Sequence, residues 1–194
     1  MKPKPTRHAT VRESANSHGY APSRNEAVEL YNAALDHLGY EGGAPIDYAR
    51  AFALNAKAAE LRDPDAVLAM GWFYVGGRGV PRDISRAQFW YRRSARHGDP
   101  RAMFNLGQIA YDAGDYSNAR RWFERASKNG HARSFYWLGK LAWRGLGVPS
   151  DRAAALALFH RAARAHDPEA IRAWRFVSRS PHSAQFHRDS SASP

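Results

Sequence analysis

The chain has 194 residues, 44% of them hydrophobic, and its 29 basic and 18 acidic residues give a formal charge of +11. It has no cysteine, which excludes disulfide bonds, thiolate nucleophiles, cysteine-held zinc and iron–sulfur clusters. No apolar run approaches the roughly 20 residues that a membrane-spanning helix needs, and no apolar stretch follows the charged N-terminus. We therefore expect a soluble, unexported protein with no transmembrane segment, and take the cytoplasm as its default location.

The two ends of the chain differ in composition from its middle. Both ends are rich in Ser, Pro, His and Arg and poor in aliphatic residues, so they cannot bury enough apolar surface to offset the entropy of ordering. We predict a disordered basic tail over residues 1–24, a folded region over 25–177 and a second disordered tail over 178–194.

An internal repeat organises the folded region. Aligning the chain with itself places Gly71, Gly107 and Gly139 in register, and an Asp stands four residues before an Ala in every unit, as at Asp83 and Ala87. We predict four units followed by a cap, over residues 26–63, 64–99, 100–131, 132–167 and 168–177.

Each unit is predicted to form two helices. Apolar and small residues recur at helical spacing, and Asp-Pro pairs at residues 63–64, 99–100 and 167–168 mark helix starts. Gly98 and Gly130 stand where a helix ends in a left-handed residue. The glycines in register lie inside helices, where glycine costs about 0.5 to 1 kcal/mol relative to alanine, so we expect a partner helix to approach closely there. Units stacked in register give an all-α fold, a right-handed α/α solenoid of four two-helix repeats with a C-terminal capping helix.

Three segments also resemble a known family. "AMFNLGQIAY", "GWFYVGGRGVPRDISRAQFWYRRSARHGD" and "WLGKLAWRGLGVPSDRAAALALFHRAA" are similar to the Sel-one-like repeat (SLR), a relative of the tetratricopeptide repeat. The third unit departs from the pattern by its short loop, and the first has Leu35 in place of the helical glycine. The resemblance covers about three quarters of the chain and implies a scaffold or adaptor, often bacterial. Secreted cysteine-rich members pair cysteines within repeats, so their absence here favours an intracellular setting.

The glycine-rich segment "GGRGVPRD" at residues 76–83 is not predicted to bind phosphate. It matches neither common phosphate-loop pattern. Pro81 removes a backbone donor, and Asp83 places a carboxylate at the helix start that an anion would occupy. We interpret the segment as a turn between helices and leave Arg78, at its tip, as a surface contact.

Catalytic and metal-binding patterns are also missing from the sequence. No common hydrolase or metal motif occurs, and His160 and His166 lack the spacing that places two ligands on one helical face. Trp90 and Trp122 share one repeat position, which favours packing over base stacking. We expect no catalytic residue, metal or cofactor. A hydrolase remains a remote alternative, because some relatives of this repeat have been described as hydrolases.

A partner is expected on the first helix of each unit, because first helices line the concave face of such solenoids. Assigning Ala102, Leu106, Ile109 and Ala110 to the core leaves a polar stripe on the other face of that helix. The equivalent positions in the second and fourth units add two tryptophans and three cations. The predicted partner-binding residues are Trp72, Arg101, Asn105, Gln108, Asp112, Arg133, Trp137, Lys140 and Arg144.

These residues predict a non-catalytic protein-interaction module. An acidic peptide or domain would complement Arg133, Lys140 and Arg144, with Trp72 and Trp137 as aromatic anchors. The alternative is sequence-independent binding of nucleic acid or an anionic membrane through the arginine-rich second helices. We favour the protein partner, since no base-reading element accompanies the arginines. The sequence does not specify an oligomeric state.

Overall fold

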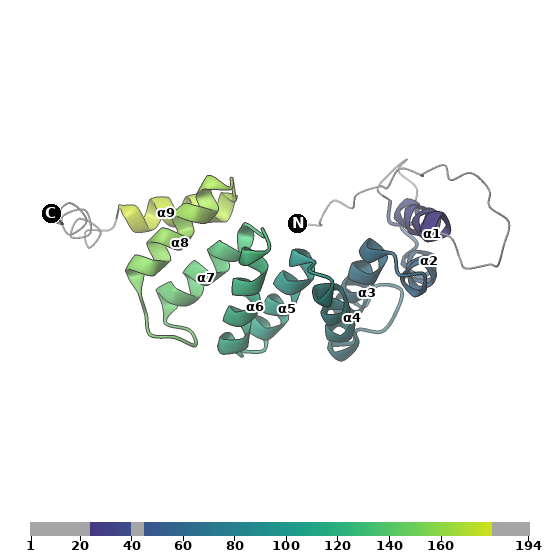
Figure 1. The fold of residues 1–194 in the computed structure, drawn as a ribbon, viewed down its shortest axis with the longest axis horizontal. Coiled ribbons are helices and arrows are strands. Elements are labelled where there is room, and N and C mark those ends of the chain that lie inside the picture. Colours follow the sequence, from purple (N-terminus) through teal and green to yellow (C-terminus); the bar gives the residue numbers. More distant parts are fainter. Residues whose placement is uncertain (1–23, 40–44, 180–194) are drawn as a thin grey trace. The chain divides into compact units, whose positions relative to one another are not determined.

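The computed structural model describes residues 24–39 and 45–179, and the two predicted tails lie almost wholly outside this part. Here the chain is helical without strands, which confirms the all-α class (Figure 1). The helices are α1 (Arg24–Asp36), α2 (Tyr48–Glu60), α3 (Pro64–Gly76), α4 (Ile84–Arg96), α5 (Pro100–Asp112), α6 (Tyr116–Lys128), α7 (Arg133–Arg144), α8 (Arg152–Arg164) and α9 (Pro168–Ser178). None of them is long and apolar enough to cross a membrane.

The helices belong to two compact units. Among the described residues, unit 1 contains α1 to α4 and ends at His97, and unit 2 begins at Gly98 and contains α5 to α9. In each unit consecutive helices pack on one another, and in unit 2 α7 also contacts α9. We call α1, α3, α5, α7 and α9 first helices and α2, α4, α6 and α8 second helices.

An aspartate begins every second helix. Each of these side chains accepts a hydrogen bond from the backbone N–H three residues later, at 2.9 to 3.1 Å, and the alanine that follows by four residues is fully buried. The carboxylate satisfies an N–H that the helix itself leaves without a partner. This pairing explains the Asp-to-Ala spacing in the sequence. The capping residues are Asp47, Asp83, Asp115 and Asp151.

Three of the first helices begin as the sequence predicts. Asp63, Asp99 and Asp167 cap α3, α5 and α9, each followed by proline. In α7 the equivalent residue is His131, and that helix begins without a side-chain cap. The residue before each of these four positions is left-handed: Arg62 (φ 66), Gly98 (φ 88), Gly130 (φ 89) and His166 (φ 60). The two glycines therefore hold the conformation predicted for them.

The helical glycines lie directly against an aromatic ring of the following second helix. A Cβ on Gly107 would lie 2.5 Å from Cε1 of Phe123, and one on Gly139 would lie 2.8 Å from Cδ1 of Phe159. A Cβ on Gly71 would overlap the ring of Tyr91. Real Cβ atoms are not found so close to a ring, so only glycine permits this packing, as the sequence predicts.

The two first helices without such a glycine have a reason to lack it. In the first pair Leu35 replaces the glycine, and Asn55 replaces the ring on α2, so the larger and smaller side chains have exchanged helices. Asn55 is fully buried, and its amide donates to the carbonyl of Ala51 at 2.9 Å. In α9 the position holds an exposed Arg175, and no helix follows α9 within the described residues. The glycine occurs where a ring must be accommodated.

The glycine-rich loops join the two helices of a repeat and also contact the repeat before it. A Cβ on Gly79 would overlap the backbone of Tyr48, at the start of α2, and a Cβ on Gly147 would lie 2.9 Å from the nitrogen of Ser117, in the first turn of α6. Both loops therefore pack against the second helix of the repeat before them, in addition to turning the chain. No side chain larger than hydrogen fits at these points.

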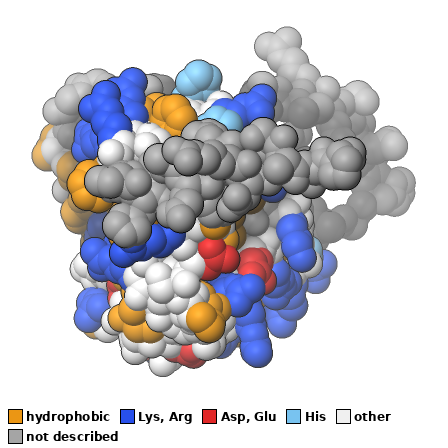
Figure 2. Space-filling model, turned by 90° about the vertical axis from the view of Figure 1, so that its left-hand side faces the viewer, with side chains coloured by type: hydrophobic (Ala, Val, Ile, Leu, Met, Phe, Trp, Pro, Cys, Tyr) orange, Lys and Arg blue, Asp and Glu red, His pale blue; other side chains and the backbone are white. Residues whose placement is uncertain are grey.

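Basic residues are concentrated on the second helices. These four helices contain thirteen Lys or Arg and two Asp or Glu, a net +11, whereas the five first helices contain seven and six, a net +1. The contrast remains at +7 against −2 when the capping aspartates are included. On the side of the molecule that carries α8 and α9, Lys and Arg (blue) cover more surface than Asp and Glu (red) (Figure 2). The charge of the folded part therefore comes from one helix of each pair.

Gly71→Ala should destabilise unit 1 more than Gly76→Ala does. The Cβ at residue 71 forces the buried Tyr91 ring to move, and overpacking of this kind costs about 1–3 kcal/mol. At residue 76, at the exposed end of the same helix, the Cβ meets only the movable end of Arg78. Urea unfolding followed by circular dichroism measures both changes. Equal effects of the two substitutions would contradict the close approach.

Candidate functional site

The first helices of unit 2 meet through an aromatic pair and a lysine. Tyr111 of α5 and Trp137 of α7 pack edge to face, with ring centroids 4.9 Å apart. The Lys140 ammonium lies 4.3 Å from the Trp137 ring centroid and 5.0 Å from that of Tyr111. A cation over two rings is held by the negative potential of their faces. We name Gln108, Tyr111, Trp137 and Lys140 the α5/α7 surface.

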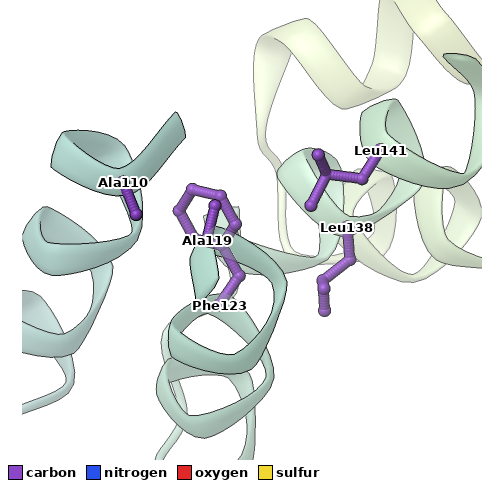
Figure 3. Close-up of a cluster of buried hydrophobic side chains, with 5 residues drawn as sticks. All are labelled: Ala110, Ala119, Phe123, Leu138 and Leu141. Atoms are coloured by element: carbon purple, nitrogen blue, oxygen red, sulfur yellow. The ribbon is translucent and has the colours of Figure 1, made fainter. Parts of the chain in front are cut away.

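Trp137 is anchored to the core below this surface. Its ring stacks on Phe123 with centroids 5.8 Å apart, and the tryptophan is half-buried. Figure 3 shows Phe123 and Ala119 of α6 lying between Ala110 of α5 and the two leucines of α7. The core of unit 2 therefore supports the α5/α7 surface directly.

Two hydrogen-bond donors on the α5/α7 surface are unsatisfied. The indole Nε1 of Trp137 and the amide Nε2 of Gln108 are buried, and neither has an acceptor among the described residues. Gln108 lies one turn before Tyr111 on α5, and it occupies the repeat position that Lys140 holds on α7. A buried donor without an acceptor costs about 1–3 kcal/mol. The surface thus combines two unsatisfied donors with an ammonium group.

Two of the predicted arginines are already paired at helix starts. Arg101 donates to the carboxylate of Asp99 at 2.9 Å, and Arg133 lies 3.7 Å from the carboxylate of Asp167. Burial of Asp99 opposes its ionisation, but the hydrogen bonds and charge of Arg101 outweigh burial and lower the pKa of this carboxyl group. These arginines hold first-helix N-termini in place, so they are less available to a partner than the sequence suggests.

The other predicted residues of unit 2 lie around the α5/α7 surface on the same helices. Asn105 is half-buried on α5. Asp112 and Arg144 are exposed at the ends of α5 and α7, and neither forms an ion pair with a described residue. Among the cations predicted to contact a partner, Lys140 and Arg144 therefore have no carboxylate partner in the described part.

Trp72 belongs to unit 1 and has contacts of its own. Arg78 places its guanidinium carbon 3.9 Å from the Trp72 ring centroid and donates to the Trp72 carbonyl at 3.0 Å. Tyr48 lies on the ring as well, with centroids 6.3 Å apart. Arg78 was predicted to be a contact at the loop tip, but it folds back onto α3 and is half-buried.

The sequence prediction missed Tyr111. This residue precedes Asp112, and the spacing of the polar stripe selected Asp112 in its place. The sequence did contain a signal for this residue: Tyr111 is an aromatic residue three positions after Gln108, and residues three apart lie on nearly the same face of a helix. Among the described residues, no three His, Asp or Glu side chains gather within reach of one metal ion.

Comparison with known families matches two kinds of helical repeat. The Sel1 repeat matches residues 32–63, 64–99 and 133–167, which together make up more than half of the chain. A tetratricopeptide repeat matches residues 82–130 and 104–146.

Two solved structures share the fold. A Sel1 repeat protein from Oxalobacter formigenes is 27% identical with a TM-score of 0.69, over 76% of this chain and 60% of that one. The c5321 protein, a protective antigen present in uropathogenic Escherichia coli strains and displaying an SLR fold, is 31% identical with a TM-score of 0.67, over 74% of this chain and 32% of that one. These likenesses confirm the predicted repeat-solenoid class.

Two curated relatives match a shorter part of the chain. The chitin synthase regulator SKT5 of Malassezia restricta is 36% identical over 73 residues, and that of Saccharomyces cerevisiae is 35% identical over 69 residues. The matches take up 38% and 36% of this chain but only 5% and 10% of those relatives. The similarity therefore concerns a small segment of each regulator.

One titratable group lies beside the site, at the start of α7. His131 stacks on Phe104 with ring centroids 4.3 Å apart, and its Nδ1 lies 3.0 Å from the hydroxyl of Ser134. Burial of the ring, together with the positive charge of Arg133, lowers the pKa of His131 to about 4, although Asp99 and Asp167 act in the opposite direction. The neutral ring can accept a hydrogen bond from the serine hydroxyl, but it does not cap a backbone N–H of α7 as the aspartates cap the other helices.

The free energy of unfolding should fall as the pH drops from 6.5 to 4. In this range His131 is protonated in the unfolded chain but stays neutral in the folded protein, because folding lowers its pKa to about 4. The loss should be on the order of 1–3 kcal/mol, since each pKa unit is worth 1.36 kcal/mol and the ring is partly solvated. It should be absent above pH 6.5. Urea unfolding of the protein and of His131→Asn across this range isolates the effect from the carboxylates. Identical pH profiles for the two proteins would contradict it.

Proposed function

Since the chain belongs to the Sel1 repeat family, we propose that it is a non-catalytic protein-interaction module that binds a partner segment on the α5/α7 surface. Sel1 and tetratricopeptide repeats generally mediate contacts between proteins. In this chain the partner would contact the α5/α7 surface and would be rich in acidic side chains and hydrogen-bond acceptors.

The unsatisfied donors on the α5/α7 surface carry the proposal. Trp137 and Gln108 offer N–H groups, and the ammonium of Lys140 lies on the Trp137 ring. An extended peptide has a carbonyl acceptor at every residue, and aspartate or glutamate side chains add carboxylate oxygens. Small rotations of Gln108 and Trp137 would bring their donors to such oxygens, which favours a partner rich in acceptors.

Charge favours an acidic partner for unit 2. With their capping aspartates, its three first helices contain six basic and four acidic residues, whereas the two of unit 1 contain one basic and five acidic residues. A partner segment with acidic residues would complement the first helices of unit 2 and be repelled by those of unit 1.

The named relatives support a regulatory role through binding. Two of them are regulators of chitin synthase by name. By analogy, we propose that this repeat binds another protein and thereby regulates it.

Selection from a random 12-residue peptide library on the immobilised protein tests the proposal. Enriched peptides should carry a net negative charge. Fluorescence anisotropy of a labelled peptide measures the Kd of its binding to the protein. Changing Lys140→Gln together with Arg144→Gln should weaken that binding by about tenfold, which corresponds to 1.4 kcal/mol for two lost charge contacts.

The matched control removes two exposed charges from a second helix, Arg121→Gln and Lys128→Gln on α6. This variant should bind the enriched peptides as the unchanged protein does. Enrichment of neutral or basic peptides, or equal weakening by both variants, would contradict the proposed surface.

A further inference from the structure

We propose that the second helices of each unit carry a binding surface for the phosphate backbone of nucleic acid. These surfaces lie on different helices from the α5/α7 surface and do not depend on the function proposed for it. Twelve of the thirteen cations on the second helices are exposed, and Arg93 is half-buried. Eleven of the thirteen are arginine, whose planar guanidinium fits phosphate oxygens in pairs.

Basic residues recur at two fixed positions of the repeat. Ten and thirteen residues after the capping aspartate, α4, α6 and α8 each have a basic residue, and α2 has Lys57 at the first of these positions. Positions three apart lie on one face of a helix. The repeated residues are Arg93 and Arg96 on α4, Arg125 and Lys128 on α6, and Arg161 and Arg164 on α8.

The arginine at the first of these positions is held against a ring in three repeats. The guanidinium carbon of Arg93 lies 5.2 Å from the Trp90 centroid, and that of Arg125 lies 4.6 Å from the Trp122 centroid. Arg161 lies 4.0 Å from the centroid of Phe135. Stacking limits the rotamers of each guanidinium while its N–H edge stays available, so less entropy is lost when phosphate binds.

Most of these cations are not neutralised by a neighbouring carboxylate. Arg50, Arg86 and Arg120 pair with acidic residues of their own helix ends or turns. The other ten form no ion pair with a described residue. On α6, Arg121, Arg125 and Lys128 follow one another at spacings of four and three, which places three such charges in one row.

The composition of the surface favours nucleic acid over an anionic membrane. A helix that lies on a membrane inserts large apolar side chains between the headgroups in addition to its cations. Among the second helices only α4 has a large exposed hydrophobic residue, Phe89, and α6 and α8 have none. Cations without apolar anchors suit a polyanion in water, and binding then follows the number of phosphate contacts.

Fluorescence anisotropy with labelled mixed-sequence 20-nucleotide single strands and 20-base-pair duplexes tests this proposal at 50 to 300 mM salt. The intact chain should bind at least one of the two, and log Kd should depend linearly on log salt, because each contact releases about 0.7 to 0.9 of a counterion. Arg121→Gln, Arg125→Gln and Lys128→Gln together should weaken binding at least tenfold and reduce the slope by about 2 to 3.

A matched variant removes three exposed charges elsewhere, Arg172→Gln, Arg175→Gln and Arg179→Gln at the C-terminal helix. It should bind nucleic acid nearly as the unchanged protein does, and circular dichroism should show equal helix content in both variants. Three results would each overturn the proposal: no binding at 50 mM salt, equal weakening by the two variants, or binding to vesicles with 30% phosphatidylserine but not to nucleic acid. These results leave the peptide selection unaffected, so the two proposals fail independently.

Discussion

The contact between a helical glycine and an aromatic ring is the constraint on which the fold of the second, third and fourth repeats depends. In three repeats the ring of the second helix occupies the space where any other residue of the first helix would have its Cβ. The ring is buried in each case. Because the two helices can only approach when that Cβ is missing, the glycine fixes both their distance and their rotation. In the first repeat, Leu35 stands at the glycine position and Asn55 at the ring position, and both are buried.

This constraint also determines which residues remain for binding. Successive residues of a helix are turned by about 100° from one another, so the residue after each glycine points away from the second helix. That residue is Trp72, Gln108 or Lys140, and in unit 2 it contributes to the α5/α7 surface. The second helices use one face for the ring and present arginines on the others. The two kinds of helix thereby acquire different surfaces, one aromatic with unsatisfied donors and one strongly basic.

The sequence predicted the helices, their capping aspartates and the close approach at the glycines, because these depend on short-range spacing. It could not predict which polar side chains would be paired with other residues of the protein. Arg133 pairs with Asp167, which is 34 residues away, and Arg78 folds onto Trp72 across a loop. Tyr111 was missed because its role depends on contact with Trp137 of another helix. Local patterns thus define the repeat, whereas the site depends on contacts between repeats.

A double-mutant cycle of Gly107→Ala and Phe123→Val tests the central constraint most directly, with urea unfolding as the measurement. In the unchanged background Gly107→Ala should cost about 1–2 kcal/mol, because the new Cβ meets the ring. Valine at residue 123 has no atom in that space, so there the same change should be neutral or stabilising by up to about 1 kcal/mol, the helix propensity gained. The coupling energy should exceed about 1 kcal/mol. An equal cost of Gly107→Ala in both backgrounds would contradict the account.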